Sequence, residues 1–169
     1  MINKIYDNLN ECIDDAFKFS AEYACEGVKE NIGGPFGACI IQKIDNKYKI
    51  VCIERNTVIS SKDATCHAEI NAIRKASQIL NRFKLSDCIL LTTAKSCPMC
   101  LSASCWAGIP VIYYGTDYSE ATTSGFKDEK IAEYIKGNND KVIKEIQITN
   151  DISLEPFKTW NEKEDKTMY

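Results

Sequence analysis

Apolar residues recur at helical spacing in the first part of the chain, from Asn10 to about Lys29. A repeat of three to four residues places such side chains on one face of a helix, so the pattern predicts an amphipathic helix here. The residues expected on its apolar face are Ile13, Phe17, Ala21, Ala24 and Val28.

The pattern changes after Gly33, Gly34 and Pro35, which break the helical repeat. Phe36–Lys43 and Lys47–Glu54 are rich in β-branched and apolar residues, and Asp45-Asn46 stands between them as a turn. Two such runs separated by a short polar turn predict a β-hairpin.

Helical and strand-like patterns alternate in the rest of the chain. A helix is expected from Asp63, as its N-cap, to Leu80, and a second helix is expected to open at Cys97-Pro98 and end near Gly108. Alternation of this kind predicts a three-layer α/β/α sandwich around a mixed sheet of about five strands, with residues 1–169 forming one domain. The remaining elements expected are buried strands at Asp87–Thr92 and Pro110–Gly115, a helix at Lys127–Lys136, an edge strand at Lys141–Thr149 and a terminal helix at Glu155–Lys166.

Composition narrows the environment and the partners. The 169 residues carry a net charge of −3, which gives no general attraction to nucleic acid. The first sixteen residues contain four acidic side chains and no long apolar stretch, and no apolar run is long enough to cross a bilayer. Nine cysteines without an export signal indicate reduced thiols and a cytoplasmic location, with the nucleus as another reducing compartment.

One imidazole and two thiols stand in the spacing of a metal site. His67, the only histidine, precedes the pair Cys97 and Cys100 in Cys97-Pro98-Met99-Cys100. Imidazole and thiolate are tetrahedral Zn²⁺ ligands, and three protein ligands leave a position for water, as catalytic zinc sites do. A structural zinc site with a fourth cysteine is the alternative, and Cys66 and Cys105 are the nearest candidates in sequence.

Glu69 follows His67 by two residues, at the expected start of a helix. A carboxylate beside a catalytic metal can take a proton from bound water and return it to a leaving nitrogen. The pattern His-x-Glu followed by Pro-Cys-x-x-Cys is typical of zinc-dependent nucleobase and nucleoside deaminases. The sequence therefore predicts hydrolytic deamination with one zinc per chain.

Around this motif the chain resembles the cytidine deaminase-like superfamily, and within it the guanine deaminases of bacterial type. The stretches that carry the resemblance, many of them outside the metal motif, are Ala24–Val28, Ile32–Ala38, Cys66–Glu69, Ala72–Ala76, Asp87–Leu90, Cys97–Leu101, Gly125-Phe126 with Asp128, and Pro156-Phe157 with Trp160.

The resemblance implies roles for residues outside the motif. Phe36 would pack on the face of the bound base, Asn56 would contact the base edge, and Ala68 would also contact the substrate. Trp106 would form an aromatic wall at the bottom of the pocket, and Asp128 would transfer protons alongside Glu69. The segment from about residue 150 to Tyr169 would close over the active site, commonly that of the partner in a swapped homodimer.

The chain departs from the family pattern before the first metal cysteine. Lys95-Ser96 stands where a Glu-Pro pair is usual, which changes the charge near the metal and leaves rate and substrate preference less secure. Deamination of guanine to xanthine and ammonia is the leading hypothesis, within cytoplasmic purine metabolism. The alternatives are guanosine, cytosine or tRNA adenosine as substrate, or a catalytically weakened zinc-binding partner subunit.

Overall fold

A mixed sheet forms the centre of the computed structural model, which describes residues 4–137 together with 156, 159, 161 and 164. Its strands lie in the order β1-β3-β2-β4-β5, and only β4 and β5 are parallel neighbours. The strand bounds are β1 Ile5–Tyr6, β2 Gly37–Ile44, β3 Lys47–Arg55, β4 Cys88–Ala94 and β5 Val111–Thr116. The helix bounds are α1 Leu9–Lys29, α2 Val58–Ser61, α3 Ala68–Leu80, α4 Pro98–Trp106, α5 Tyr118–Thr123 and α6 Asp128–Ile135.

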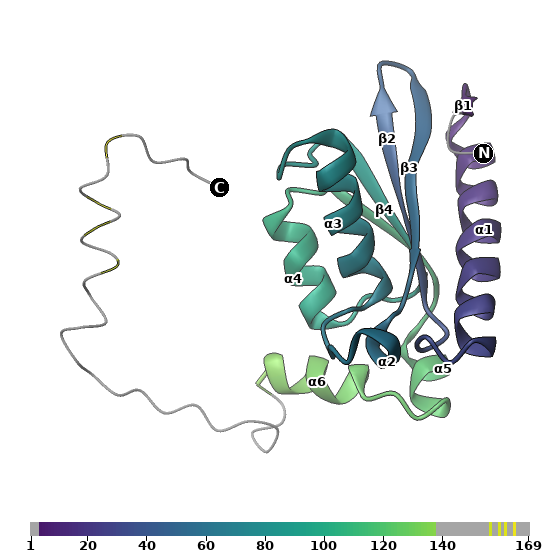
Figure 1. Ribbon diagram of the computed structural model, residues 1–169, viewed down its shortest axis with the longest axis vertical. Coiled ribbons are helices and arrows are strands. Elements are labelled where there is room, and N and C mark those ends of the chain that lie inside the picture. The colour runs from purple at the N-terminus through teal and green to yellow at the C-terminus, as the bar shows by residue number, and fades with distance from the viewer. Residues whose placement is uncertain (1–3, 138–155, 157–158, 160, 162–163, 165–169) are drawn as a thin grey trace.

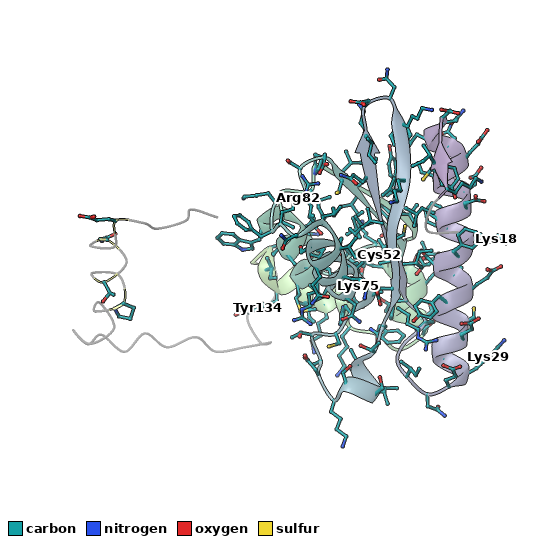
Figure 2. The ribbon with its side chains drawn as sticks, turned by 45° about the horizontal axis from the view of Figure 1, so that its top comes forward. Lys18, Lys29, Cys52, Lys75, Arg82 and Tyr134 are labelled. Carbon is teal, nitrogen blue, oxygen red and sulfur yellow. The ribbon has the colours of Figure 1, made fainter. Side chains whose placement is uncertain are left out.

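Helices cover both faces of the sheet, which confirms the predicted α/β/α sandwich. Figure 1 shows α1 on one face and α3 with α4 on the other. Successive residues of β2 point to opposite faces, so Cys39 and Ile41 pack with α1 while Ile40 packs with α3. Lys18 and Lys29 on α1 point away from the sheet in Figure 2.

The buried face of α1 is rotated relative to the prediction. Its buried residues are Cys12, Ala16, Ser20, Ala24 and Gly27, whereas the predicted Val28 is 44% exposed. The reason is close packing. A Cβ on Gly37 of β2 would lie 2.1 Å from the Ser20 carbonyl oxygen, so small residues on both elements let the helix approach the sheet.

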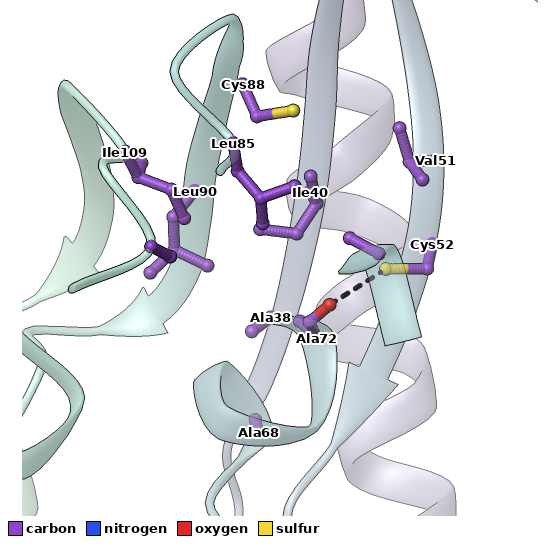
Figure 3. Close-up of a cluster of buried hydrophobic side chains, with 12 residues drawn as sticks. Ala38, Ile40, Val51, Cys52, Ala68, Ala72, Leu85, Cys88, Leu90 and Ile109 are labelled. Atoms are coloured by element: carbon purple, nitrogen blue, oxygen red, sulfur yellow. Dashed lines mark hydrogen bonds between the residues drawn. The ribbon is translucent and has the colours of Figure 1, made fainter. Parts of the chain in front are cut away.

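The opposite core lies between α3 and the sheet (Figure 3). Ala68, Ala72 and Ala76 are fully buried along α3 and pack against fully buried Ile40 and Leu90. The Cys52 thiol donates to the Ala72 carbonyl oxygen at 3.3 Å, the dashed line in Figure 3. This packing fixes the start of α3 against the sheet.

Other boundaries differ from the prediction for local reasons. Helix α3 begins at Ala68 rather than after Asp63, because the Asp63 carboxylate accepts from the Thr65 amide and its carbonyl oxygen accepts from the Cys66 amide, so Asp63 begins a tight turn. Strand β5 was expected to be buried, but it is the last strand of the described sheet and five of its six residues are exposed.

The sequence did not predict α2, α5 or the short strand β1. The strand predicted at 141–149 and most of the helix predicted at 155–166 lie outside the described residues. Among the helices that are described, none has both the length and the apolar character for crossing a membrane.

Candidate active site and metal centre

A pocket of about 400 Å³ opens where the N-termini of α3 and α4 meet the loops from β2, β3 and α5. That volume lies in the range of small-molecule sites. Six of the ten predicted site residues line it: Phe36, Asn56, His67, Glu69, Cys97 and Asp128. A seventh, Cys100, lies directly behind Cys97 at 0% exposure.

His67, Cys97 and Cys100 converge on one point with the spacing of zinc ligands. The His67 Nδ1 atom lies 3.6 Å from each cysteine sulfur, and the three ligand atoms all lie within 4.8 Å of one another. Tetrahedral bonds of about 2.0 Å to nitrogen and 2.3 Å to sulfur require nitrogen and sulfur ligands about 3.6 Å apart. The donor set therefore fits a zinc ion held by three protein ligands.

Local structure explains how two of these ligands are placed. His67 and Cys97 are the N-cap residues of α3 and α4, and both have extended backbone angles. Pro98 occupies the first position of α4, where its missing N–H costs no hydrogen bond. A helix N-terminus carries partial positive charge, which favours the thiolate that a metal requires.

The electrostatics of the ligands agree with a thiolate at Cys97. A hydrogen bond from Cys100, followed by one from His67, lowers the pKa of Cys97 against the opposing effect of burial. The same hydrogen bond raises the pKa of Cys100. Hydrogen bonding to Cys97 also raises the pKa of His67. Hydrogen bonding within the cluster therefore favours the thiolate form of Cys97, which is the form that binds a metal.

Two carboxyl groups face the pocket in surroundings that disfavour their charge. Glu69 is only 5% exposed in the first turn of α3, and burial raises its pKa. Asp128 opens α6 and is half-buried, and desolvation followed by the nearby Cys97 raises its pKa. Carboxyl groups with raised pKa values are suited to accept and return protons near neutral pH.

The loop after β3 fixes the orientation of Asn56. Its Oδ1 atom accepts hydrogen bonds from the amides of Gly34 and Val58, each at 3.1 Å. The same loop is tied to α3 by the Asn71 side chain, which donates to the Arg55 carbonyl oxygen at 2.9 Å. Because the amide oxygen is engaged, the Asn56 side chain is oriented to offer its NH₂ group to a ligand.

The aromatic part of the pocket differs from the sequence-based expectation. Phe36 lines it as expected, but its aromatic neighbour is Phe126, whose ring lies edge-on at 4.7 Å between centroids. Trp106 is 68% exposed at the end of α4 and is not among the residues that line this pocket, so its role as an aromatic wall stays a prediction. Ala68 is fully buried in the α3 core rather than at the pocket surface, and Tyr169 lies outside the described residues.

Several further residues complete the lining. Val58, Ile59 and Ala64 form an apolar side that the sequence did not single out, because they follow no motif or periodicity. Lys95 also reaches the pocket, and it was noticed only as a departure from the family pattern.

Comparison with known proteins decides the family. Residues 11–116 match the model of the cytidine and deoxycytidylate deaminase zinc-binding region. The chain belongs to this deaminase family. It is 39% identical over 153 residues to the guanine deaminase of Bacillus subtilis strain 168, which covers 90% of this chain and 96% of that protein. Its structure matches an X-ray structure of Bacillus subtilis guanine deaminase with a TM-score of 0.83 and 38% identity, covering 92% of this chain and 98% of the other.

The chain is also similar to a tRNA-specific deaminase. The tRNA-specific adenosine deaminase of Buchnera aphidicola is 31% identical over 129 residues, 76% of this chain and 82% of that protein. With the ligand set, the buried carboxylate and these matches together, the protein is a zinc-binding hydrolytic deaminase.

Proposed function

We propose that this protein is a guanine deaminase, which converts guanine and water to xanthine and ammonia. The observation that carries the reaction type is the meeting of a His67-Cys97-Cys100 ligand set with the buried Glu69 carboxylate in one pocket. The substrate class is supported by the similarity to Bacillus subtilis guanine deaminase over 90% of the chain.

The proposed mechanism assigns a task to each polar residue. A zinc ion held by His67, Cys97 and Cys100 would act as a Lewis acid and lower the pKa of water at the site. Glu69 takes a proton from the attacking water and delivers it to a ring nitrogen of the base. Asp128, which lines the same pocket, takes the second proton of the added water and passes it to the exocyclic amine, so that the carbon–nitrogen bond breaks, the carbonyl forms and the amine departs as ammonia.

Binding of the base depends on the remaining lining residues. Phe36 offers an aromatic face to a flat purine, and Phe126 supports that ring from its edge. The Asn56 amide, held through its oxygen, donates to an acceptor on the base edge. A flat ring with an acceptor beside its reactive carbon fits these contacts.

The test is a Glu69→Gln protein assayed for ammonia release and for bound zinc. We expect zinc content to be retained and kcat on guanine to fall by about 10²–10⁴, the usual contribution of general acid–base catalysis. Glu54→Gln is the matched control, because burial also raises the pKa of Glu54 but this residue does not line the pocket. Full activity in a zinc-loaded Glu69→Gln protein would contradict the mechanism.

Substrate choice is tested with the parent protein. Guanine, guanosine, adenine, cytosine and a tRNA anticodon stem are compared at equal concentration, and guanine is expected to give the highest kcat/KM. Faster turnover of the tRNA stem would favour the activity of the tRNA-specific relative instead. A zinc-loaded protein inactive on every base would favour a weakened partner subunit.

We also propose one zinc per chain and a homodimer in the cytoplasm. None of the nine cysteines, all of them described, is in a disulfide, which agrees with a reducing compartment. Large apolar side chains are exposed on α4 and on the outer strand β5, which supports the dimer; they are Leu101, Trp106, Val111, Tyr113 and Tyr114. Light scattering is expected to give twice the 19.0 kDa chain mass. If the terminal segment closes the active site, a chain ending at residue 149 will lose kcat/KM on guanine while keeping its zinc.

A further inference from the structure

The two residues between β4 and the first metal cysteine are held by the last residue of β5 and by the start of α5. The Lys95 amide donates to the Thr116 carbonyl oxygen at 2.8 Å. The Tyr118 hydroxyl donates to the Ser96 carbonyl oxygen, also at 2.8 Å. These contacts join the loop that presents Cys97 to the start of α5.

The Lys95 side chain adds a charged contact between the same two segments. Its Nζ atom lies 3.0 Å from Asp117 Oδ1. It also lies 4.9 Å from the ring centroid of Tyr118 and 5.6 Å from that of Tyr114, within the range of cation–π attraction. Lys95 therefore connects the pocket that it lines with Asp117, the residue immediately before α5.

Asp117 has a second task at that position. It is the N-cap of α5, its carboxylate accepts from the Tyr118 amide at 2.7 Å, and Glu120 completes a capping box. The chain then turns back, with the Phe126 amide donating to the Ala121 carbonyl oxygen at 3.0 Å, and reaches Asp128 at the start of α6. The location of Asp117 thus sets where α5 begins and where the residues after it lie.

We infer that Lys95 is a positioning residue. Through Asp117 it holds the segment from α5 to the start of α6, with Phe126 and Asp128, against the loop that presents Cys97. The expected effect of Lys95 on kcat rests on the proposed deaminase function, whereas the hold of Lys95 on the segment after Asp117 does not.

Hydrogen–deuterium exchange tests the link without reference to activity. Lys95→Met removes the charge at similar length. Asp117→Asn removes the opposite charge and keeps a good N-cap. In the zinc-loaded protein, both are expected to speed exchange in residues 118–128 by about twofold to fivefold, as loss of an exposed ion pair shifts a local opening equilibrium. Exchange in α3 should not change.

Lys4→Met is the matched control. Lys4 also pairs with an aspartate, Asp15, at 2.8 Å and lies 4.3 Å from the ring centroid of Tyr6, but it stands beside α1 and does not line the pocket. It should leave exchange in 118–128 unchanged. If neither Lys95→Met nor Asp117→Asn alters that exchange, or Lys4→Met alters it equally, the inference is overturned.

Kinetics test whether the link positions Asp128. Lys95→Met is expected to lower kcat on guanine by about fivefold, since small displacements of a reacting group reduce rate. Lys95→Arg should restore it. In an Asp128→Asn background the same Lys95→Met change should lower kcat by less than about twofold, because no carboxylate remains to be positioned. An equal loss in both backgrounds overturns the positioning role.

A parent protein inactive on guanine refutes the proposed function. Hydrogen–deuterium exchange still decides whether Lys95 holds residues 118–128 through Asp117.

Discussion

Gly33 lies against Asn56, so the single methyl group added in Gly33→Ala should displace Asn56. A Cβ at Gly33 would lie 2.2 Å from the Asn56 carbonyl oxygen and 2.4 Å from its Oδ1 atom. Non-bonded carbon and oxygen atoms in contact stand about 3.4 Å apart, so Gly33→Ala forces these atoms to separate by about 1 Å. The clash involves backbone, which a rotamer change cannot relieve.

That displacement acts on the pocket through two sets of contacts. The Asn56 Oδ1 atom would lose its 3.1 Å hydrogen bonds from Gly34 and Val58, and with them the orientation of its NH₂ group. The backbone N–H of Asn56 also donates to the Phe36 carbonyl oxygen at 3.0 Å, so Phe36 would shift as well. A misplacement of about 1 Å can cost about 10²-fold in rate, and we expect that loss in kcat/KM on guanine.

The assay is steady-state ammonia release by folded, zinc-loaded Gly33→Ala protein. Gly27→Ala is the control, because the added Cβ lies 2.9 Å from the Arg55 Cδ atom, on a flexible side chain outside the pocket. It should keep parental kcat/KM. A Gly33→Ala protein within about threefold of the parent would refute the reasoning that this glycine positions the Asn56 amide group proposed to bind the base.

Two further predictions concern stability. Leu90→Ala should reduce the free energy of unfolding by about 2–5 kcal/mol, because Leu90 is fully buried between the sheet and α3, whereas Ile79→Ala, at a site 52% exposed, should change it by less than about 0.5 kcal/mol in the same urea titration. A hydrogen bond from Arg82 lowers the pKa of Asp87 from 3.8 to about 2. The contribution of this pair is therefore present above pH 3.8 and lost as pH falls toward 2, so Asp87→Asn should remove that part of the acid dependence, and an unchanged acid profile would contradict it.

The metal ligands could be predicted because their placement is local. His67 and Cys97 each stand at a helix N-cap, and Pro98 marks the start of α4 in the sequence itself. The three-residue separation of Cys97 and Cys100 then puts both sulfurs on one side of one turn. Only the meeting of the two helices depends on the fold, and the α/β pattern already places both beside the same sheet.

The face of α1 and the exposure of β5 could not be read from hydrophobicity. The buried face of α1 consists of small residues such as Ser20 and Gly27, because the helix packs close to Gly37. Hydrophobicity scales rank residues by polarity and not by size, so they do not identify this face. An apolar strand such as β5 has the same pattern whether a helix or another chain covers it. Helix α5, by contrast, carried a readable signal in its capping box of Asp117 and Glu120.

Of the two pocket carboxylates, only Glu69 could be predicted from its spacing in the sequence. Glu69 is tied to His67 by two positions in one motif, but Asp128 comes from a different helix, and only the tertiary fold brings it to the same pocket. No spacing rule joins them, so only the resemblance to a deaminase family suggested Asp128. Burial disfavours the charge of both groups, and a neutral side chain of equal size would fill either position without that cost. The cost of burying both carboxylates therefore supports the proton-transfer roles proposed for them.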